Sequence, residues 1–432
     1  MRNQVVVGVA VGTTVVAVAI GALIWRWKLM KEQQLKHARN IIRKFARECA
    51  TPVAKLWQVA DDLVSQMKAS LDSPSSNETS SSSTLNMIIS NVTALPNGDE
   101  EGFFYGVNVH GTNVLILCAR LGGKNKPICD LQREEIPIPP HVLAGSSMVR
   151  KGLMKDLNQA LKNLGTKMHI FALVDETIGG LAGGRYYNRD SVAAITLAMR
   201  TNAAYTEPSE DPYSTEMVIS MEWGNFRSPH LPLTSFDTRL DSESTNPGSG
   251  IFEKLISGMY LGEIARLVLL KLAQETGLFG SKVPPNLMTA YALSSPDMAA
   301  MHQDTSEDRE IVGEMLNDIF GIDNSSLLAR ELVAEVCDIV TERGARLAGA
   351  GIIGIIKKLD RIENRKSVVT VEGGLYEHYR IFRNYLHSSV WQMLGKDFSD
   401  NVIVEHSHGG TGTGALFLAA AHTHKPLSSD SL

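Results

Sequence analysis

This chain of 432 residues has few cysteines and few aromatic residues, and its net charge is small. Its four cysteines (Cys49, Cys118, Cys129 and Cys337) are scattered and form no CxxC pair, which argues against a disulfide framework or a zinc site and fits a reducing compartment. The formal net charge is −5, so no overall basic excess points to nucleic acid. With 44% hydrophobic residues the composition is that of a globular protein, and the length predicts two domains.

Charge is absent from residues 3–25. As a helix, this stretch would span roughly 34 Å, against a bilayer core of about 30 Å. A block of seven basic residues and one acidic residue follows between positions 26 and 44. A cleavable signal peptide would have a shorter apolar region and no basic block after it. We therefore predict an uncleaved membrane anchor with its basic flank over residues 1–30, with the rest of the protein facing the cytosol.

Hydrophobic periodicity predicts an α/β chain. Apolar residues at helical spacing from Ala38 to Met67 predict one long amphipathic helix, and serine-rich residues 73–84 predict a loop. The further predicted elements are strands at 103–109, 113–121 and 127–137, a helix at 148–164, strands at 167–175, 192–198 and 216–222, helices at 250–276, 309–319 and 327–349, a strand at 367–372, a helix from 374, a strand at 401–405 and a helix at 412–422. The second part echoes the first, which indicates duplicated halves.

Two adjacent carboxylates, Asp175 and Glu176, end the apolar run of residues 170–174. A small, glycine-rich segment follows at once, as where a buried strand turns into a helix packed closely against its sheet. A carboxylate at the edge of a sheet suits a general base that acts on a hydroxyl group.

Three glycine-containing turns are candidates for a nucleotide cleft. Gly111, Thr112 and Asn113 lie in a predicted β-turn-β, where backbone N–H groups and a hydroxyl suit phosphate oxygens. Gly373 and Gly374 follow a predicted strand and open a helix. Residues 409–414 repeat that arrangement. One such turn alone is more often a plain turn, but three in this context predict a nucleotide site.

Polar residues at strand ends suit a sugar. Glu222 and Asn225 put a carboxylate and a carboxamide at a predicted strand end, and Glu253 lies near the start of a predicted helix. The plainer interpretations are a solvated strand end and a helix N-terminal charge. The four histidines near the C-terminus (His406, His408, His422 and His424) lack a carboxylate or cysteine partner, so we predict no metal site there.

The chain resembles a plant hexokinase of the membrane-anchored type. The matching stretches are residues 49–52, 111–113, 181–187, 201–205, 221–226, 252–263 and 343–347, and the resemblance covers residues 38–422. It implies an actin-like, two-lobed sugar-kinase fold, divided at 38–187 and 188–425. It further implies hexose and ATP with Mg²⁺ in the cleft, transfer of phosphate to the 6-hydroxyl, roles in glycolysis and sugar sensing, and attachment to the mitochondrial outer membrane.

On this resemblance, Glu176 occupies the position of the family's catalytic aspartate, and Asp175 precedes it. Asn202, Glu222, Asn225 and Glu253 are the sugar-side residues, and Gly111, Thr112, Asn113, Gly373 and Gly374 are the nucleotide-side residues.

Four departures from the family pattern bear on catalysis. The pattern Asp-Leu-Gly-Gly-Thr-Asn is replaced by residues 108–113, which begin with Asn108 and carry His110. The family's Asn-Asp-Thr becomes residues 175–177, where Glu176 is one methylene longer than the aspartate. The pattern Gly-Thr-Gly-Thr-Asn becomes residues 198–202, where Ala198 and Arg200 replace glycines. Several dozen family residues that carry sugar-binding Thr and Lys are absent near residues 147–148.

We therefore predict a hexokinase-like protein with a truncated small lobe and with absent or severely weakened kinase activity, acting as an anchored sensor or interaction protein. The alternative is an active hexokinase with Glu176 as base. A third possibility is that the sequence is the non-functional product of a misassembled gene. A skipped exon and a true shortening of the protein would leave the same junction at residues 147–148.

Overall fold

The computed structural model divides into two compact units, each described by itself below. One unit comprises residues 1–50, 232–240 and 262–340, and the other comprises 51–231, 241–261 and 341–432. The structure describes residues 2–72, 85–110, 113–137, 158–159, 161–163, 165, 170, 174–208, 216–407 and 412–423, without the side chains of residues 2–24, 27, 109 and 110.

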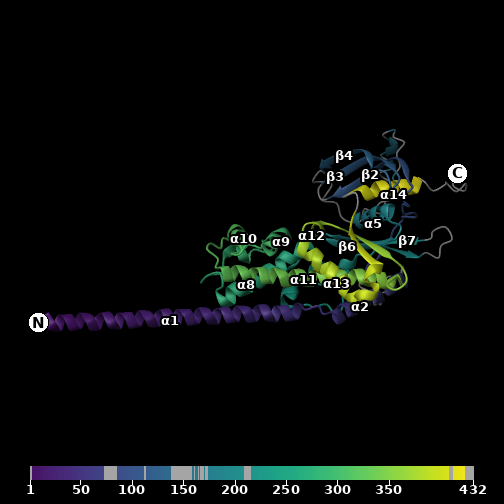
Figure 1. Cartoon of the computed structure of the whole chain (residues 1–432). Helices are drawn as coiled ribbons and strands as arrows, with labels where there is room; N and C mark the ends of the chain where they lie inside the picture. Colours follow the sequence, from purple (N-terminus) through teal and green to yellow (C-terminus); the bar gives the residue numbers. More distant parts are fainter. Residues whose placement is uncertain are drawn as a thin grey trace. The chain divides into compact units, whose positions relative to one another are not determined.

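The first unit begins with the long helix α1 (Arg2–Cys49), drawn in purple in Figure 1. The predicted anchor, residues 3–25, is helical in its backbone, but nearly all its side chains lie outside the described part. Among the residues that are described, no helix is long and apolar enough to cross a membrane. The anchor therefore stays a prediction.

The prediction of one helix from Ala38 to Met67 is wrong, because the chain forms two helices there. Helix α1 ends at Cys49 and α2 (Val53–Asp72) begins after Pro52. Proline disfavours helical backbone at the preceding residue, which explains the break at Thr51. The apolar stripe nevertheless continues in both helices, because Phe45 and Leu63 are fully buried.

Helices make up the described remainder of the first unit. These are α6 (Ser235–Glu243), α8 (Gly258–Thr276), a 3₁₀ turn η3 (Pro285–Met288), α9 (Ser295–Gln303), α10 (Glu310–Phe320) and α11 (Leu327–Lys358), of which α6, α8 and α11 also contribute residues to the second unit. Phe45 packs edge-to-face on Phe236 at 5.3 Å between ring centroids. Buried Arg266 donates from Nε to Glu263 at 2.7 Å, so these charges are paired.

The predicted helix over 250–276 is two helices. Ser257 is extended (φ −90°, ψ 153°) and separates α7 (Ile251–Ile256) from α8. Periodicity alone does not register this break, because the residues on both sides of it are apolar and buried.

A six-stranded sheet in the order β1-β7-β6-β5-β8-β9 organises the second unit. The strands are β1 (Ile88–Ile89), β5 (Ser191–Leu197), β6 (Thr201–Pro208), β7 (Glu216–Ser220), β8 (Ser367–Glu372) and β9 (Val402–His406). The pairs β5–β8 and β8–β9 are parallel, whereas β1, β7, β6 and β5 pair antiparallel. Strand β6 was not predicted, because its alanines, Asn202 and Pro208 have low strand propensity.

A three-stranded antiparallel sheet, in the order β2-β3-β4, also belongs to the second unit. Its strands β2 (Glu101–His110), β3 (Asn113–Gly122) and β4 (Cys129–Pro137) confirm the three predicted there. Of the strand predicted over 167–175, residues 170, 174 and 175 are described and none is in a strand, and the other residues lie outside the described part. The described residues of the helix predicted over 148–164 are 158–159 and 161–163, and all are helical.

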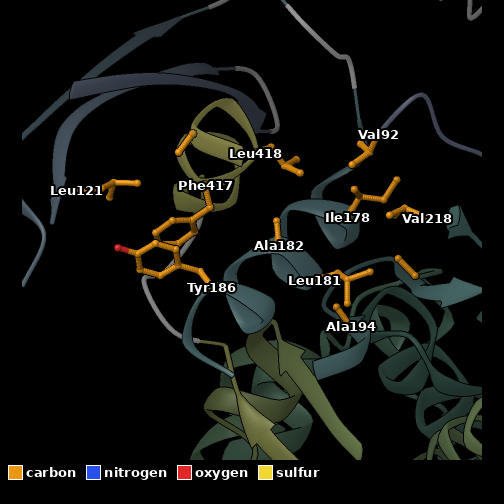
Figure 2. Close-up of a cluster of buried hydrophobic side chains, with 12 residues drawn as sticks. Val92, Leu121, Ile178, Leu181, Ala182, Tyr186, Ala194, Val218, Phe417 and Leu418 are labelled. Carbon is orange, nitrogen blue, oxygen red and sulfur yellow. The ribbon is translucent and has the colours of Figure 1, made fainter. Parts of the chain in front are cut away.

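The remaining helices of the second unit are α5 (Glu176–Tyr187), the 3₁₀ turn η2 (Trp223–Asn225), α12 (Gly374–Glu377), α13 (Arg380–Phe398), the 3₁₀ turn η4 (Ser399–Asn401) and α14 (Thr413–Thr423). Figure 2 shows side chains of α5 and α14 meeting in one apolar cluster, where the Tyr186 and Phe417 rings stack at 4.2 Å. Glycines permit this contact, because a methyl group at Gly414 would overlap the backbone of Gly179. A methyl group at Gly184 of α5 would also overlap the side chains of Thr370 on β8 and Ser191 on β5, so the predicted close packing of this helix against its sheet is confirmed.

Candidate active site

Asp175 begins helix α5 and joins it to the large sheet. Its Oδ1 accepts the N–H of Ile178 at 3.0 Å, the bond expected of an N-cap aspartate. Its Oδ2 accepts a short hydrogen bond from the Ser220 hydroxyl at the end of β7, and a longer one of 3.4 Å from Nδ2 of Asn202 on β6. The Asp175 carboxylate is therefore occupied by protein donors.

Asn202 and Glu222 share this cluster. The Asn202 Nδ2 donates to Glu222 Oε1 at 3.2 Å and to Ser220 Oγ at 2.9 Å. Glu222 has a left-handed backbone (φ 51°, ψ 41°), unusual for this residue type, as it turns from β7 into η2. The structure thus brings two predicted sugar-side residues together with Asp175.

Asn225 and Glu253 lie on neighbouring elements, η2 and α7. A methyl group at Gly224 would come within 3.0 Å of the Glu253 Cβ, so the two elements are in close contact there. Trp223 anchors η2, because its ring packs edge-to-face on Phe252 at 5.5 Å and its Nε1 donates to Thr201 at 2.9 Å. Glu253 Oε1 also accepts from Nε of Arg200 at 3.4 Å.

A pocket of about 50 Å³, room for a few water molecules, adjoins the two carboxylates. Asp175 and Glu176 line it, with Asn108 from β2, Glu372 from the end of β8 and residues 412–415 at the start of α14. Of the three predicted glycine-containing turns, residues 412–414 of the third line the pocket directly, and Gly373 of the second directly follows Glu372, which lines it.

Glu372 is a functional candidate that the sequence did not single out, although it directly precedes Gly373 and Gly374. Burial, and then the negative charge of Glu176, raise the pKa of its carboxyl to about 8. Thr196 donates to Glu372 Oε1 at 3.2 Å, and the Thr196 hydroxyl also bonds the Thr177 hydroxyl at 2.9 Å. Glu372 is therefore largely protonated at neutral pH. Its position after an apolar strand is the signal that could have identified it.

The predicted nucleotide-side residues are only partly in place. Gly111 and Thr112 lie outside the described residues. Asn113 donates to Glu135 of β4 at 2.7 Å and does not line the pocket. Gly373 needs its glycine, because its φ is +103° and a methyl group would overlap the Leu197 backbone. Its N–H donates to Glu377 at 2.9 Å, and Gly374 opens α12.

Of the four C-terminal histidines, His406 and His422 are described. His406 Nε2 lies 3.4 Å from Glu377 Oε1. Within the described part of the chain, no group of three or more histidine, cysteine or acidic side chains could hold a metal ion.

Known proteins resemble this chain in sequence and in fold. Two family models, both described as hexokinase, match residues 41–149 and 192–421. Hexokinase-1 of Spinacia oleracea is 39% identical over 495 residues, covering 98% of each chain, and Hexokinase-2 of Solanum tuberosum is 40% identical over 497 residues, covering 98% of this chain and 99% of its own. A hexokinase from Schistosoma mansoni complexed with glucose shares the fold, with a TM-score of 0.74 at 24% identity over 90% of this chain and 99% of that one.

Proposed function

The chain belongs to the hexokinase family, and we propose that it binds a hexose but phosphorylates it with ATP slowly or not at all. The cluster of Asp175, Asn202 and Glu222 supports hexose binding, because it gathers carboxylates and a carboxamide from three elements. Sugar hydroxyls donate to such oxygens and accept from such amides. The protein acts, on this proposal, as a sugar sensor or interaction protein.

The turn between β5 and β6 carries this proposal. The family pattern is glycine-rich there, and its backbone N–H groups bind phosphate. Here the N–H of Ala198 donates to the Arg200 carbonyl at 3.1 Å. The Ala198 and Met199 carbonyls accept the N–H groups of Gly258 at 2.8 Å and Met259 at 3.1 Å. One N–H group of the turn, that of Ala198, is therefore already used by the protein, and two side chains stand where glycines would leave the backbone open.

Mg²⁺ with ATP fits the described residues poorly. Asn108 replaces a charged family residue with a neutral carboxamide, whose buried Nδ2 has no hydrogen-bond partner among the described residues. A cation prefers charged oxygen ligands, and the carboxamide of Asn108 supplies only a neutral one. The Gly373 N–H, which would suit a phosphate oxygen, is held by Glu377.

Glu176 is the candidate base, since the Asp175 carboxylate is engaged by three donors. Glu176 lines the pocket, but it is one methylene longer than the family's aspartate. A displacement of about 1 Å costs on the order of 10²-fold in rate. Positioning and electrostatics supply most of the catalysis in phosphoryl transfer. The longer side chain of Glu176 and the altered turn therefore both lower the rate of phosphoryl transfer.

The Glu176→Ala variant tests the proposal against its alternative. If the protein is catalytically impaired, the substitution leaves the already low rate of glucose phosphorylation unchanged. The alternative, an active hexokinase with Glu176 as base, is favoured by the position of Glu176 in the pocket and predicts that the variant loses turnover. A Glu176→Asp variant restores the family residue, and we expect its rate to rise if base position limits turnover.

A shortened small lobe is part of the proposal. The alignment with the spinach relative extends over 495 residues, more than the 432 of this chain, so that relative has residues with no counterpart here. The first family model also ends at residue 149, beside the junction at residues 147–148, which lies outside the described residues. The first observation supports the loss of a segment, and the second supports its place near that junction.

Attachment to the mitochondrial outer membrane, facing the cytosol, is the last part of the proposal. Its support is the uncharged stretch 3–25, followed by the basic flank. The backbone there is one uninterrupted helix.

A further inference from the structure

Arg200 is a basic side chain that contacts one of the predicted sugar-side residues, Glu253. The turn that carries it is fixed by the contacts of Ala198 and Met199 with Gly258 and Met259. Its Nε lies 3.4 Å from Oε1 of Glu253. The backbone beside Arg200 is thus held in place, and the Arg200 side chain contacts one carboxylate.

The two partners of this ion pair differ greatly in exposure. The Arg200 side chain is 86% exposed and that of Glu253 is 14% exposed. A guanidinium has five N–H donors in a planar fork, and the contact to Glu253 uses only the Nε. Since its terminal nitrogens lie on a largely exposed side chain, they are accessible to an acceptor that enters from solvent.

The other sugar-side groups are acidic or neutral. Glu222 and Glu253 are acceptors that suit the hydroxyls of a neutral hexose. Arg200 already donates to Glu253, so a hexose hydroxyl competes with it for that carboxylate. An anionic group on the sugar instead gains a charge-assisted, bidentate hydrogen bond from the same side chain.

We propose that Arg200 makes this site select a hexose that carries an anionic group over a neutral hexose. The inference rests on the proposed hexose-binding function. The anionic group is a phosphate or a carboxylate on the sugar. Arg200 would donate hydrogen bonds to this group, while Glu222 and Asn202 would bind the sugar hydroxyls.

Calorimetric titration of the full-length protein tests this selectivity. The probes are glucose, glucose 6-phosphate, glucuronate and inorganic phosphate. We expect both anionic sugars to bind about tenfold more tightly than glucose, as for one charge-assisted bidentate contact. Tight binding of only one anionic sugar identifies whether phosphate or carboxylate is recognised. Inorganic phosphate binding as tightly as glucose 6-phosphate would overturn the proposal, because the sugar would then contribute nothing.

The variant Arg200→Gly should abolish the preference for anionic sugars over glucose. We expect glucose to bind about two- to fivefold more tightly, as for release of an exposed ion pair, and the anionic sugars to lose their advantage. Arg189→Gly is the matched control, since Arg189 also lies in a turn and pairs with an exposed carboxylate, Asp99, at 3.2 Å. It should change neither affinity.

The outcomes separate this inference from the proposed function. If wild-type protein and Arg200→Gly both bind glucose with equal affinity and the wild type does not prefer anionic sugars, the selectivity is wrong while hexose binding stands. If neither protein binds any sugar and both unfold cooperatively on heating, the hexose-binding function itself is wrong, and the selectivity fails with it.

Discussion

Glu372 lines the pocket, and its burial there raises the pKa of its carboxyl from the ordinary value of 4.5 to about 8. The raised pKa means that the folded protein holds its proton more tightly than the unfolded chain does. Its contribution to stability is therefore fully present below the ordinary value of 4.5 and is lost as the pH rises through about 8.

The variant Glu372→Gln should remove this loss, because a neutral amide has no proton to lose. Relative to wild type, we expect its free energy of unfolding to gain about 1–3 kcal/mol between pH 5 and pH 8.5, measured by urea denaturation. Glu335→Gln, on the exposed face of α11, is the control and should follow the wild type. Parallel pH profiles for Glu372→Gln and wild type would contradict the assigned environment.

The sequence predicted the residues of the sugar-side cluster better than those of the nucleotide site. Asn202 and Glu222 were matched by sequence pattern, and they share hydrogen bonds in the structure. The engagement of the Asp175 carboxylate was not predictable, because it depends on Ser220, which is distant in sequence. The raised pKa of Glu372 likewise arises from burial between elements, which no local pattern encodes.

At the scale of elements, the contact between α5 and α14 holds the pocket together. Glycines allow the two helices to approach, and Tyr186 and Phe417 stack beside them (Figure 2). The pocket residues Glu176 and Thr413 are the first residues of these helices. Packing of the two helices therefore positions the pocket as well as stabilising the fold.

The variant Gly414→Ala should disturb this contact. Its methyl group would overlap the Gly179 backbone, which has no rotamer to change, so we expect a loss of about 1–3 kcal/mol in unfolding free energy. Gly374→Ala is the control, because the nearest heavy atom to its added methyl is 3.9 Å away. Equal stability of the two variants in urea denaturation would show that the helices can separate without cost.

Sequence patterns predicted long, strongly periodic elements and missed breaks and weak strands. Strands β2, β3, β8 and β9 follow their predicted positions closely. The break at Ser257 and the strand β6 depend on tertiary contacts that override local preference, namely the Gly258 bond to Ala198 and pairing with β5 and β7.

At the scale of the whole molecule, both compact units bury large apolar side chains. Among the described residues, the largest fully buried side chains include Trp223, Phe252 and Phe382. We expect the full-length protein to show a cooperative thermal unfolding transition. The product of a misassembled gene would instead be insoluble or would unfold gradually, so differential scanning calorimetry distinguishes the two.

The proposed membrane attachment is also tested on the whole chain. Removal of residues 1–30 should move the protein from the membrane fraction to the supernatant on cell fractionation, because the uncharged stretch is then lost. A variant with Lys28, Lys31 and Lys36 changed to glutamine keeps that stretch and should remain in the membrane fraction. Identical fractionation of the truncated and full-length proteins would show that residues 1–30 are not the anchor.

On the proposed function, hexose binding persists where phosphoryl transfer does not. The most direct test measures both on one preparation of the full-length protein, with glucose binding by calorimetry and glucose phosphorylation by coupled assay with Mg²⁺ and ATP. We predict saturable glucose binding and a kcat/KM at least about 100-fold below that of the spinach relative assayed alongside. Turnover comparable to that of the spinach relative would contradict the proposed loss of kinase activity.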